Sequence, residues 1–436
     1  MKELRCKNIT LSDDKTLVCV PVTGANLTEI KSQAKQIRKM KPDLVEWRAD
    51  FLKIEDPEND VVELTYALKV LHKSLKSLPI LFSFRNTDEG GARRVNFETY
   101  KKYLHYIALM ADKCNVDLID VEAYSKRDVK GIDELIDEIH DADAKIIGSC
   151  HKVNSTPRKQ ELVEILTNIE EMGCDVCKLA VLPHNKYDVE ELIGASCEAN
   201  EKLKAPIVTM AMEELGAITR VCTKLTKSCI TFAAGVEESA PGQLSFEITK
   251  SLLEVNHNSR VAENISLIGF MGTGKTTVSH ALSRILGMEE VDTDKTIVEQ
   301  TGKQIAELYP ELGEEKFRNL ETEILRDISK RENTIISCGG GIVLRNENVH
   351  ILKDTSTVVR LDADPEVIFK RVKRRTTRPL LNDDMSLEHV KSMMNEREGR
   401  YSTAADITVN VDGGERVMTC YRIIEQLKKS GVVRVD

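Results

Sequence analysis

The sequence predicts an α/β protein with two successive units, and two observations carry this prediction. Between residues 17 and 233, short apolar runs alternate with amphipathic helical stretches eight times. Near residue 270, an apolar run, a glycine-rich loop and a helical run follow one another directly. Such alternation is typical of parallel strands covered by helices, and eight repeats favour a (β/α)8 barrel. A doubly wound open sheet would also alternate, but it usually has fewer strands and a glycine-rich first turn, which this stretch lacks.

The elements of the first unit follow from these runs in chain order. The expected strands cover residues 17–22, 44–51, 79–85, 116–123, 145–151, 176–182, 207–212 and 229–233. The expected helices cover residues 27–40, 61–75, 98–111, 132–142, 159–172, 189–199, 217–225 and 246–255. A hairpin over residues 4–11 is expected to close the bottom of the barrel. Residues 256–260 are polar and predict a brief linker between one domain at 1–258 and another at 262–436.

Composition and charge exclude several classes of protein. The net charge of −9 argues against a nucleic-acid partner bound through its phosphates. No run approaches the roughly 18 apolar residues of a membrane span, and residues 1–10 lack the features of a signal peptide. The 11 cysteines follow no disulfide or zinc spacing, and the pair Cys174 and Cys177 is interpreted as a coincidence on a buried strand. The sequence therefore predicts a soluble cytoplasmic protein with reduced thiols.

Polar side chains gather near the C-terminal ends of five expected strands. Glu46, Arg48 and Asp50 share one face of their strand, because successive side chains alternate between faces. The other strands contribute Ser83, Arg85, Asp120, Glu122, Ser149, His151 and Lys178. Isolated charges inside a barrel often form internal salt bridges, but burying so many of them without purpose would be costly. Since barrel active sites lie at this end, the pattern predicts a catalytic site.

Lys178 is the strongest candidate for the reacting group of the first unit. Apolar neighbours and the cation Arg85 would lower the pKa of a lysine, and a neutral amine can form a Schiff base with a ketone. His151, on the adjacent strand, would move protons, and Glu89, on a loop, would orient His151. Arg220 and the stretch 239–243 follow the last two strands and indicate an anionic substrate, although 239–243 alone would be read as an ordinary turn.

Together these residues resemble the type I 3-dehydroquinate dehydratase family. The resemblance covers roughly residues 1–250 and rests on Glu46-Trp47-Arg48-Ala49-Asp50, Phe84-Arg85-x-x-x-Glu89-Gly90-Gly91, Ser149-x-His151, Lys178-x-Ala180-x-x-Pro183, Gly216-x-x-x-Arg220 and Ser239-Ala240-Pro241-Gly242-Gln243. It implies that Lys178 forms an imine with the C3 ketone of 3-dehydroquinate, without a cofactor. His151 would take the C2 proton, and Glu89 would position His151. Substrate binding would fall to Glu46, Arg48, Arg85, Arg220, Ser239 and Gln243.

The second unit opens with a phosphate-binding loop. The stretch Gly269-Phe270-Met271-Gly272-Thr273-Gly274-Lys275-Thr276 stands between an apolar run at 265–268 and a helical run at 277–286. In this context the glycines turn backbone N–H groups toward phosphate, and the helix N-terminus adds its dipole. Lys275 would reach the outer phosphates and Thr276 would hold Mg²⁺. The expected nucleotide-binding residues are Gly269, Gly272, Thr273, Gly274, Lys275, Thr276 and Thr277.

Downstream runs add strands at residues 334–337, 357–362 and 406–411, which predict a small parallel α/β fold. Asp292 and Asp294 stand two apart at a strand end, so one could serve Mg²⁺ and the other a substrate hydroxyl. Gly339-Gly340-Gly341 would let a small ligand approach the backbone. The basic run 370–378 suggests nucleotide phosphate, with a solvated helix face or a nucleic-acid patch as the alternative.

These features resemble shikimate kinase over roughly residues 264–430. Besides the loop, the resemblance rests on Asp292-x-Asp294, Phe317-Arg318, Gly339-Gly340-Gly341, Arg378-Pro379-Leu380-Leu381 and Glu396-Arg397-x-x-x-Tyr401. It implies ATP and Mg²⁺, with Thr276 and Asp292 serving the metal. Shikimate would be held by Asp294, Arg318, Gly340 and Arg397. Lys275 and Arg378 would stabilise charge on the transferring phosphoryl group, and Asp294 would orient or deprotonate the acceptor hydroxyl.

The sequence thus predicts a bifunctional enzyme that dehydrates 3-dehydroquinate and phosphorylates shikimate. The resemblance implies that these steps are not consecutive and that a reductase acts between them, so direct channelling is not expected. Two alternatives stay open from the sequence. One is an aldolase-like barrel fused to another small-molecule kinase, and the other is a nucleotide-binding regulator with an inactive barrel. A homodimer through the first unit is expected from the resemblance.

Overall fold

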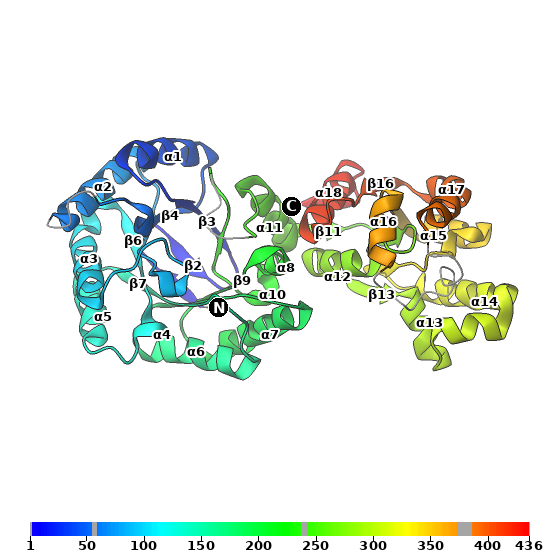
Figure 1. Ribbon diagram of the computed structural model, residues 1–436, viewed down its shortest axis with the longest axis horizontal. Helices are drawn as coiled ribbons and strands as arrows, with labels where there is room; N and C mark the ends of the chain where they lie inside the picture. Colours follow the sequence, from blue (N-terminus) through cyan, green and yellow to red (C-terminus); the bar gives the residue numbers. More distant parts are fainter. Residues whose placement is uncertain (1, 55–58, 237–241, 374–385, 436) are drawn as a thin grey trace. The chain divides into compact units, whose positions relative to one another are not determined.

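The chain forms two compact units, Met1–Leu253 and Glu254–Asp436, each built around its own parallel sheet (Figure 1). The computed structural model describes residues 2–54, 59–236, 242–373 and 386–435. No helix in these ranges combines the length and apolar character needed to cross a membrane.

The first unit is a barrel of eight parallel strands that pair in the order β10-β3-β4-β5-β6-β7-β8-β9. The strands are β3 (Leu17–Val22), β4 (Leu44–Arg48), β5 (Ile80–Ser83), β6 (Val116–Val121), β7 (Lys145–Lys152), β8 (Val176–Val181), β9 (Ile207–Ala211) and β10 (Ile230–Phe232). Between β9 and β10 the closure is reduced to a single bridge from Ile207 to Ser228. The predicted (β/α)8 barrel is therefore confirmed, with one loosely joined seam.

Helices surround the strands as a ring (Figure 1). The long helices are α1 (Leu27–Met40), α2 (Asp60–Leu75), α3 (Phe97–Met110), α5 (Ile132–Asp141), α6 (Lys159–Glu171), α7 (Lys186–Lys202) and α11 (Phe246–Asn258). Shorter segments are η1 (Ala49–Phe51), η2 (Thr87–Glu89), η3 (Asp112–Cys114), α4 (Ala123–Lys126), α8 (Glu213–Gly216), α9 (Ile218–Val221) and α10 (Thr223–Thr226). The single helix expected over 217–225 is wrong, because Cys222 leaves helical geometry (φ −94°, ψ 54°) and separates α9 from α10.

Two apolar cores hold the barrel, one between strands and helices and one inside its lower end. The outer core includes Val45 and Trp47, the strand side chains that alternate with the inward Glu46 and Arg48. The inner core includes Leu11 and Cys6 from the N-terminal hairpin, β1 (Glu3–Arg5) paired with β2 (Thr10–Ser12). The hairpin expected at the barrel bottom is thus confirmed.

Two expected boundaries are wrong. The strand predicted over 44–51 ends at Arg48, and η1 turns the chain outward, so Asp50 reaches the site from a 3-10 turn. The linker predicted over 256–260 is regular structure: α11 continues to Asn258, and β11 (Ser259–Val261) pairs with β17 (Val433–Val435). Asn256 is buried, and its side-chain amide donates hydrogen bonds to the carbonyls of Arg284 and Ile285.

The second unit contains a parallel five-stranded sheet with the order β13-β14-β12-β15-β16, which confirms the predicted small α/β fold. Its strands are β12 (Asn264–Ile268), β13 (Glu289–Asp292), β14 (Thr334–Ser337), β15 (Ser356–Asp362) and β16 (Ile407–Asn410). Its helices are α12 (Lys275–Leu286), α13 (Thr293–Thr301), α14 (Ile305–Ile328), α15 (Asn346–Thr355), α16 (Pro365–Val372), α17 (Leu387–Ala404) and α18 (Arg416–Lys429), with η4 (Ile342–Leu344). The loop after β12 leads directly into α12, as the glycine motif predicts.

Candidate active sites

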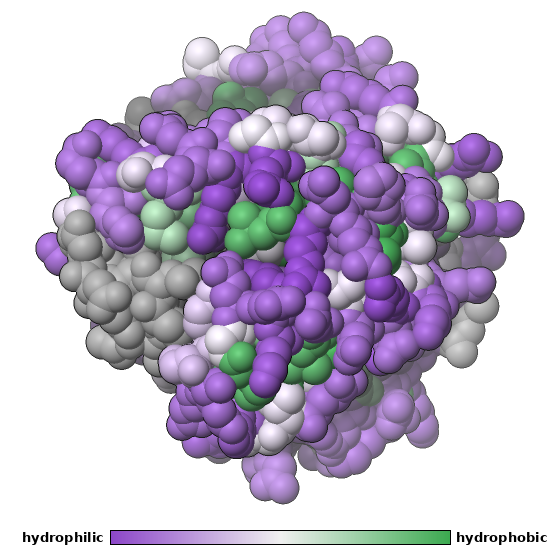
Figure 2. Space-filling view, turned by 90° about the vertical axis from the view of Figure 1, so that its right-hand side faces the viewer, coloured by the Kyte–Doolittle hydropathy of each residue, from purple (hydrophilic) through white to green (hydrophobic). Residues whose placement is uncertain are grey.

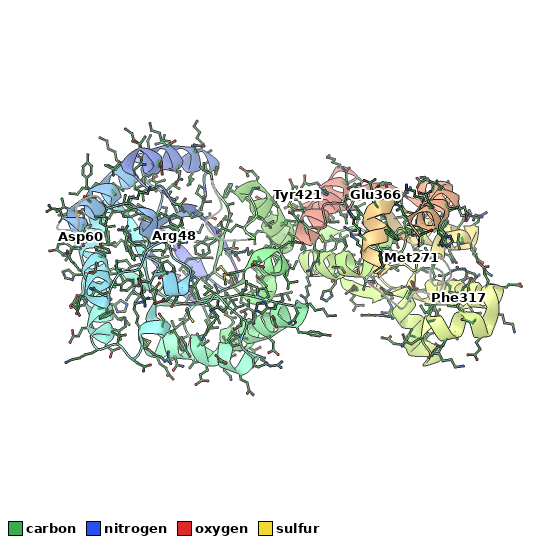
Figure 3. The ribbon with its side chains drawn as sticks, viewed as in Figure 1. Arg48, Asp60, Met271, Phe317, Glu366 and Tyr421 are labelled. Atoms are coloured by element: carbon green, nitrogen blue, oxygen red, sulfur yellow. The ribbon has the colours of Figure 1, made fainter. Side chains whose placement is uncertain are left out.

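A cavity of about 270 Å³ opens at the C-terminal ends of the barrel strands. Residues that line it include Glu46, Arg48, Arg85, Glu89, His151, Lys178, Arg220, Gln243, Met210, Met212 and Phe232. In Figure 3, Arg48 lies inside the ring of helices, whereas Asp60 lies in the ring itself. Eight of the predicted site residues therefore meet in one pocket. Ser239, the ninth, lies outside the described residues.

Lys178 stands in the middle of β8, next to Ser149 of β7 in the strand register. It is 4% exposed, and its Nζ lies 3.1 Å from Oδ2 of Asp120 and 4.6 Å from the centre of the Phe232 ring. Asp120 also accepts from the Ser149 hydroxyl at 2.7 Å and from the Arg85 guanidinium at 2.7 Å. Burial opposes ionisation of Asp120, but Arg85 and Lys178 outweigh it and lower the pKa of this carboxyl.

His151 is held by Glu89 at two points. Oε2 of Glu89 accepts from the backbone N–H of His151 at 3.1 Å and lies 2.9 Å from its Nδ1. Burial, together with Arg85 and Lys178, lowers the pKa of His151 well below 6.5. Burial also raises the pKa of Glu89, although Arg85 opposes this shift. A neutral His151 that donates from Nδ1 to Glu89 keeps Nε2 as a proton acceptor.

Two arginines of the pocket are tied to carboxylates, which fixes their direction. Arg48 forms a bidentate pair with Asp50, with both N–O distances at 2.8 Å. Arg85 contacts Asp120, Glu89 and Glu122 at 2.7, 3.3 and 3.5 Å. Glu46 accepts from the Ser83 hydroxyl at 2.8 Å. The sequence named Asp120 among the strand-end charges but not as the link between Arg85 and Lys178.

Arg220 differs from these arginines, because no described carboxylate pairs with it. Its side chain is buried, its Nε has no hydrogen-bond partner among the described residues, and its NH1 faces the sulfur of Met210 at 3.4 Å. Burial alone lowers the pKa of Arg220 to about 10. A guanidinium held in this way is suited to an anionic ligand.

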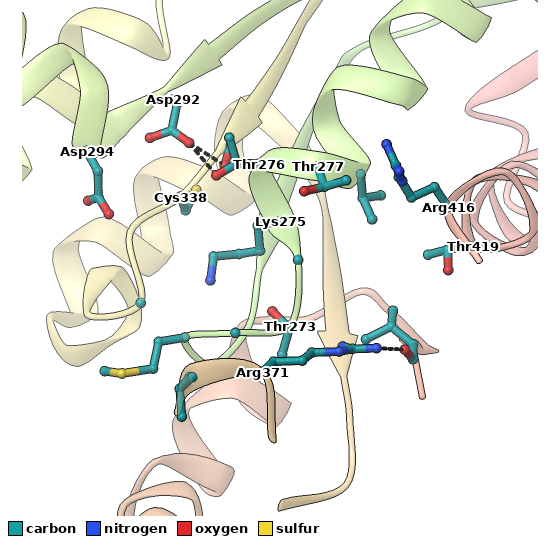
Figure 4. A pocket seen from close by; sticks show the side chains of 18 of the residues that line it. Thr273, Lys275, Thr276, Thr277, Asp292, Asp294, Cys338, Arg371, Arg416 and Thr419 are labelled. Atoms are coloured by element: carbon teal, nitrogen blue, oxygen red, sulfur yellow. Dashed lines mark hydrogen bonds between the residues drawn. The ribbon is translucent and has the colours of Figure 1, made fainter. Parts of the chain in front are cut away.

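The glycine loop of the second unit borders a cavity of about 550 Å³ (Figure 4). Gly272 and Gly274 have φ angles of +88° and +94°, which other residues rarely adopt. Lys275 donates from Nζ to the carbonyls of Gly269 and Phe270 at 2.7 and 3.2 Å. The predicted residues that line this cavity are Gly272, Thr273, Gly274, Lys275, Thr276, Thr277, Asp292, Asp294 and Gly340.

Asp292 connects the loop to the neighbouring strands. Its Oδ2 accepts from the hydroxyls of Thr276 and Ser337, both at 2.9 Å (Figure 4). Its Oδ1 accepts from the backbone N–H of Lys295, so Asp292 also caps α13. Asp294 lies in the first turn of α13, not on the strand. The sequence predicts both acids at one strand end, but β13 ends at Asp292 and Asp294 belongs to α13, so the two carboxylates reach the cavity from different elements.

Gly339 and Gly341 make room for two of the predicted shikimate-binding side chains. A Cβ at Gly339 would stand 2.5 Å from Oδ1 of Asp294, and one at Gly341 would stand 2.1 Å from NH1 of Arg318. Arg318 is buried and donates to Glu321 at 2.8 Å. The carbonyl of Gly340 accepts from the Tyr401 hydroxyl at 2.6 Å.

Arg397 lies on α17, where its guanidinium carbon is 5.8 Å from the centre of the Phe270 ring. Burial raises the pKa of the Tyr401 hydroxyl to about 12, and the nearby Arg397 opposes this shift. The predicted lid residue Arg378 lies outside the described residues.

The sequence motifs do not identify every residue of the cavity beside the glycine loop. Arg371, Arg416 and Thr419 line it beyond the glycine loop (Figure 4). Arg371 belongs to the basic run 370–378, whereas Arg416 is the first residue of α18 and lies in no motif. A cation at a helix N-terminus opposes the helix dipole, and this is the one signal that could have identified it.

Comparison with known proteins assigns both units. Residues 18–260 match the family model of type I 3-dehydroquinase, and residues 271–428 match that of shikimate kinase. The 3-dehydroquinate dehydratase of Clostridioides difficile (strain 630) is 36% identical over 265 residues, 59% of this chain and 98% of that protein. A crystal structure of the Clostridium difficile type I enzyme, titled as covalently modified by comenic acid, aligns with a TM-score of 0.54 at 36% identity, over 59% of this chain and 98% of that one.

For the second unit, shikimate kinase from Acinetobacter baumannii, solved in complex with shikimate, is 30% identical over 38% of this chain and 94% of that chain, with a TM-score of 0.38. The matches to the two family models occur in the order that the motifs predict, and they favour this pair of activities over an aldolase-like barrel joined to another kinase. The chain belongs to the type I 3-dehydroquinase family through its barrel and continues into a shikimate kinase, so it is a bifunctional lyase and transferase of the shikimate pathway.

Proposed function

We propose that Lys178 carries the dehydration of 3-dehydroquinate as a Schiff base. The amine attacks the C3 ketone, and loss of water gives an imine. Its protonated form draws electrons from C2, so that the C2 proton can pass to His151. The C1 hydroxyl then leaves with a proton returned by His151, and hydrolysis of the imine releases the product. The observation that carries this proposal is the convergence of Lys178, His151 and Glu89 in one buried pocket.

The same pocket offers separate groups for the two ends of the substrate. Arg220, buried without an acidic partner in the described residues, suits the substrate carboxylate, together with Gln243 and Ser239. Glu46, Arg48 and Arg85 suit the substrate hydroxyls, and they are held by Ser83, Asp50 and Asp120, respectively. This division would direct the C3 ketone toward Lys178.

For the second unit we propose that Asp294, Arg318, Gly340 and Arg397 bind shikimate. Asp294 would orient or deprotonate the 3-hydroxyl that attacks the terminal phosphate. Lys275 and Arg378 would stabilise charge on the transferred group, since phosphoryl transfer depends mostly on positioning and electrostatics. The contact of Gly339 with Asp294 and of Gly341 with Arg318 supports this assignment.

The residues around the glycine loop fit ATP and Mg²⁺. Thr276 and Ser337 converge on one oxygen of Asp292, and such an oxygen set suits Mg²⁺, which is usually held by one or two carboxylates together with phosphates. Thr276 and Asp292 would hold the ion, and Gly269, Gly272, Thr273, Gly274 and Thr277 would surround the phosphates. Bound Mg²⁺ supplies neutralisation of phosphate charge. Arg371 and Arg416 border the remainder of the cavity and would contact the nucleoside.

The two activities test these assignments directly. Adding 3-dehydroquinate should produce the absorbance of a conjugated enone, and borohydride should trap substrate on Lys178. Adding shikimate and ATP should produce shikimate 3-phosphate. Separate expression of residues 1–258 and 262–436, the domain limits we propose, should divide the activities between the two pieces. Enone formation without trapping on Lys178 would contradict the Schiff base.

We also propose that the barrel forms a homodimer through α2 and α3. Four of the large exposed apolar side chains lie on these neighbouring helices: Val62, Tyr66, Tyr106 and Leu109. Lys69 and Lys73 stand at one end of this surface and Glu98 at the other, so a twofold pairing with antiparallel helices would join unlike charges. By contrast, the face seen in Figure 2 shows only small, separate hydrophobic areas.

Sedimentation of the wild type and of Tyr66→Glu tests the dimer. A dimer that the substitution converts to a monomer is expected, and a monomeric wild type would contradict the proposal. The eleven cysteines are free thiols, which supports the cytoplasmic location that the sequence predicts.

A further inference from the structure

The loop that carries Glu89 is anchored by two buried carboxylates, Asp50 in η1 and Glu122 directly after β6. The loop begins after β5, passes through Arg85 and η2, and continues to Ala92. Asp50 accepts from the backbone N–H of Arg85 at 3.3 Å and from that of Ala92 at 2.9 Å, so it joins the two ends of the turn. Glu122, at the end of β6, holds Asn86.

Glu122 is fully buried and uses both carboxylate oxygens on this loop. Oε1 accepts from the backbone N–H of Asn86 at 2.7 Å, and Oε2 accepts from its side-chain amide at 3.1 Å. Lys126 donates to Oε2, and Arg85 lies 3.5 Å from Oε1, so the buried charge is compensated. No step proposed above uses this carboxylate.

Asn86 in turn holds the backbone of Glu89 through hydrogen bonds. Its backbone carbonyl accepts from the N–H groups of Glu89 and Gly91 at 3.0 and 2.9 Å, and its side-chain oxygen accepts from Val95 at 3.0 Å. The position of the Glu89 backbone is therefore set by Asn86, and Asn86 is set by Glu122. Glu89 in turn holds His151 through two hydrogen bonds.

We infer that Glu122 is a positioning residue for dehydration, which acts through Asn86 and Glu89 on His151. This inference rests on the proposed roles of Glu89 and His151. Both oxygens must accept, because the two donors of Asn86 approach them separately. A glutamine at this position offers one acceptor, and its amide would face a donor of Asn86. The turn would then shift, and a displacement near 1 Å at a catalytic group can lower a rate by about 10²-fold.

The test compares Glu122→Gln with Tyr100→Phe in the full chain. The Tyr100 hydroxyl accepts from the backbone N–H of Glu122 at 3.0 Å but makes no hydrogen bond to the loop, so Tyr100→Phe reproduces the loss of a buried hydrogen bond beside Glu122. For Glu122→Gln we expect kcat to fall by about 10- to 100-fold with KM within twofold. Borohydride should still trap 3-dehydroquinate on Lys178, since imine formation does not depend on the turn.

A second readout separates displacement of His151 from a loss of folded protein. With 3-dehydroquinate deuterated at C2, the isotope effect on kcat should rise in Glu122→Gln, because proton transfer becomes slower than the other steps. A smaller fraction of active protein would lower kcat without changing the isotope effect. Tyr100→Phe should keep the wild-type kcat and isotope effect.

Three results would overturn the inference: an unchanged kcat in Glu122→Gln, a fall in kcat with an unchanged isotope effect, or an equal loss in Tyr100→Phe. If Glu122→Gln does not fold, Asn86→Ala provides the same test, because it keeps the backbone N–H and removes the side-chain contacts. Failure of the wild type to dehydrate 3-dehydroquinate would instead contradict the proposed function. Shikimate phosphorylation by the same samples serves as an internal control, because it shows that the second unit of each variant is folded and active.

Discussion

Glu89 holds His151 by both its backbone and its ring, with Oε2 at 3.1 Å from the backbone nitrogen and 2.9 Å from Nδ1. The single carboxylate oxygen therefore fixes the position of the residue and the direction of its ring. Nε2 is left for the substrate, and burial beside Arg85 and Lys178 keeps the imidazole neutral.

The first prediction concerns the pH dependence of dehydration. The pKa of His151 lies well below 6.5, and a base that must be neutral stays active down to its own pKa. Activity should therefore be nearly constant from pH 7.5 down through pH 6.5, and protonation should reduce it only at lower pH. The measurement is kcat/KM for 3-dehydroquinate across this range. Half-maximal activity near pH 6.5 on the acid side would contradict the lowered pKa.

Replacing His151 should slow proton transfer while sparing the Schiff base. We expect His151→Ala to reduce kcat by roughly 10²- to 10⁴-fold, the usual contribution of a general base. Borohydride should still attach the substrate to Lys178. The control is Lys178→Ala, in which trapping and dehydration should both disappear. Normal turnover in His151→Ala would assign the proton transfer to another group.

Much of the barrel could be predicted because strand alternation and chain order are local properties. Glu46 and Arg48 face inward because Val45 and Trp47 belong to the outer core. The bridge of Asp120 between Arg85 and Lys178 could not be predicted in the same way. It depends on the stagger among β5, β6 and β8, and the pairing of β5 with β6 contains a register shift at Ile80 and Leu81.

In the second unit, too, contacts between distant parts of the chain could not be predicted from the sequence. Polar residues at 256–260 resemble a linker, but their side chains and backbone bond to parts of the chain far away in sequence, at Arg284 and in β17. The close approach of Gly341 to Arg318 likewise joins α14 to the glycine turn after β14, which lies far away in sequence. Motif spacing predicts candidate residues, whereas packing between distant elements determines what each candidate contacts.

A third prediction follows from that contact. In Gly341→Ala, the new methyl group would overlap the guanidinium of Arg318, whose nearest atom stands 2.1 Å from the Cβ position. Loss of a charge-assisted hydrogen bond of about 1.5–3 kcal/mol should raise KM for shikimate roughly tenfold or more, with KM for ATP unchanged. The matched control is Gly399→Ala on α17, where a Cβ meets nothing within 4 Å. Equal kinetics in both variants would exclude Arg318 from shikimate binding.

Metal removal should separate the two activities. Thr276, Ser337 and Asp292 form an oxygen site in the second unit, whereas the proposed dehydration uses only side chains. Excess EDTA is expected to abolish ATP-dependent phosphorylation and to leave enone formation unchanged. Added Mg²⁺ should restore phosphorylation in the wild type and poorly in Asp292→Asn. Dehydration that is lost with EDTA would mean that the barrel also needs a metal.

Arg220 leads to a prediction in which binding and stability change in opposite directions. Arg220 is buried with no acidic partner among the described residues, which destabilises the free protein, and burial lowers the pKa of its guanidinium to about 10. Arg220→Met keeps similar volume and removes the charge, so the melting temperature of the free protein should stay equal or rise. Without the guanidinium, KM for 3-dehydroquinate should increase roughly 30-fold or more, a loss of about 2 kcal/mol or more.

Differential scanning calorimetry and steady-state kinetics on the same samples measure both effects. Arg48→Met is the matched control, because Arg48 is also buried but forms a bidentate pair with Asp50. Removing Arg48 leaves Asp50 buried without its partner, so this variant should lose stability as well as affinity. A clear fall in the melting temperature of Arg220→Met would contradict this account, because it would show that the Arg220 charge stabilises the free protein.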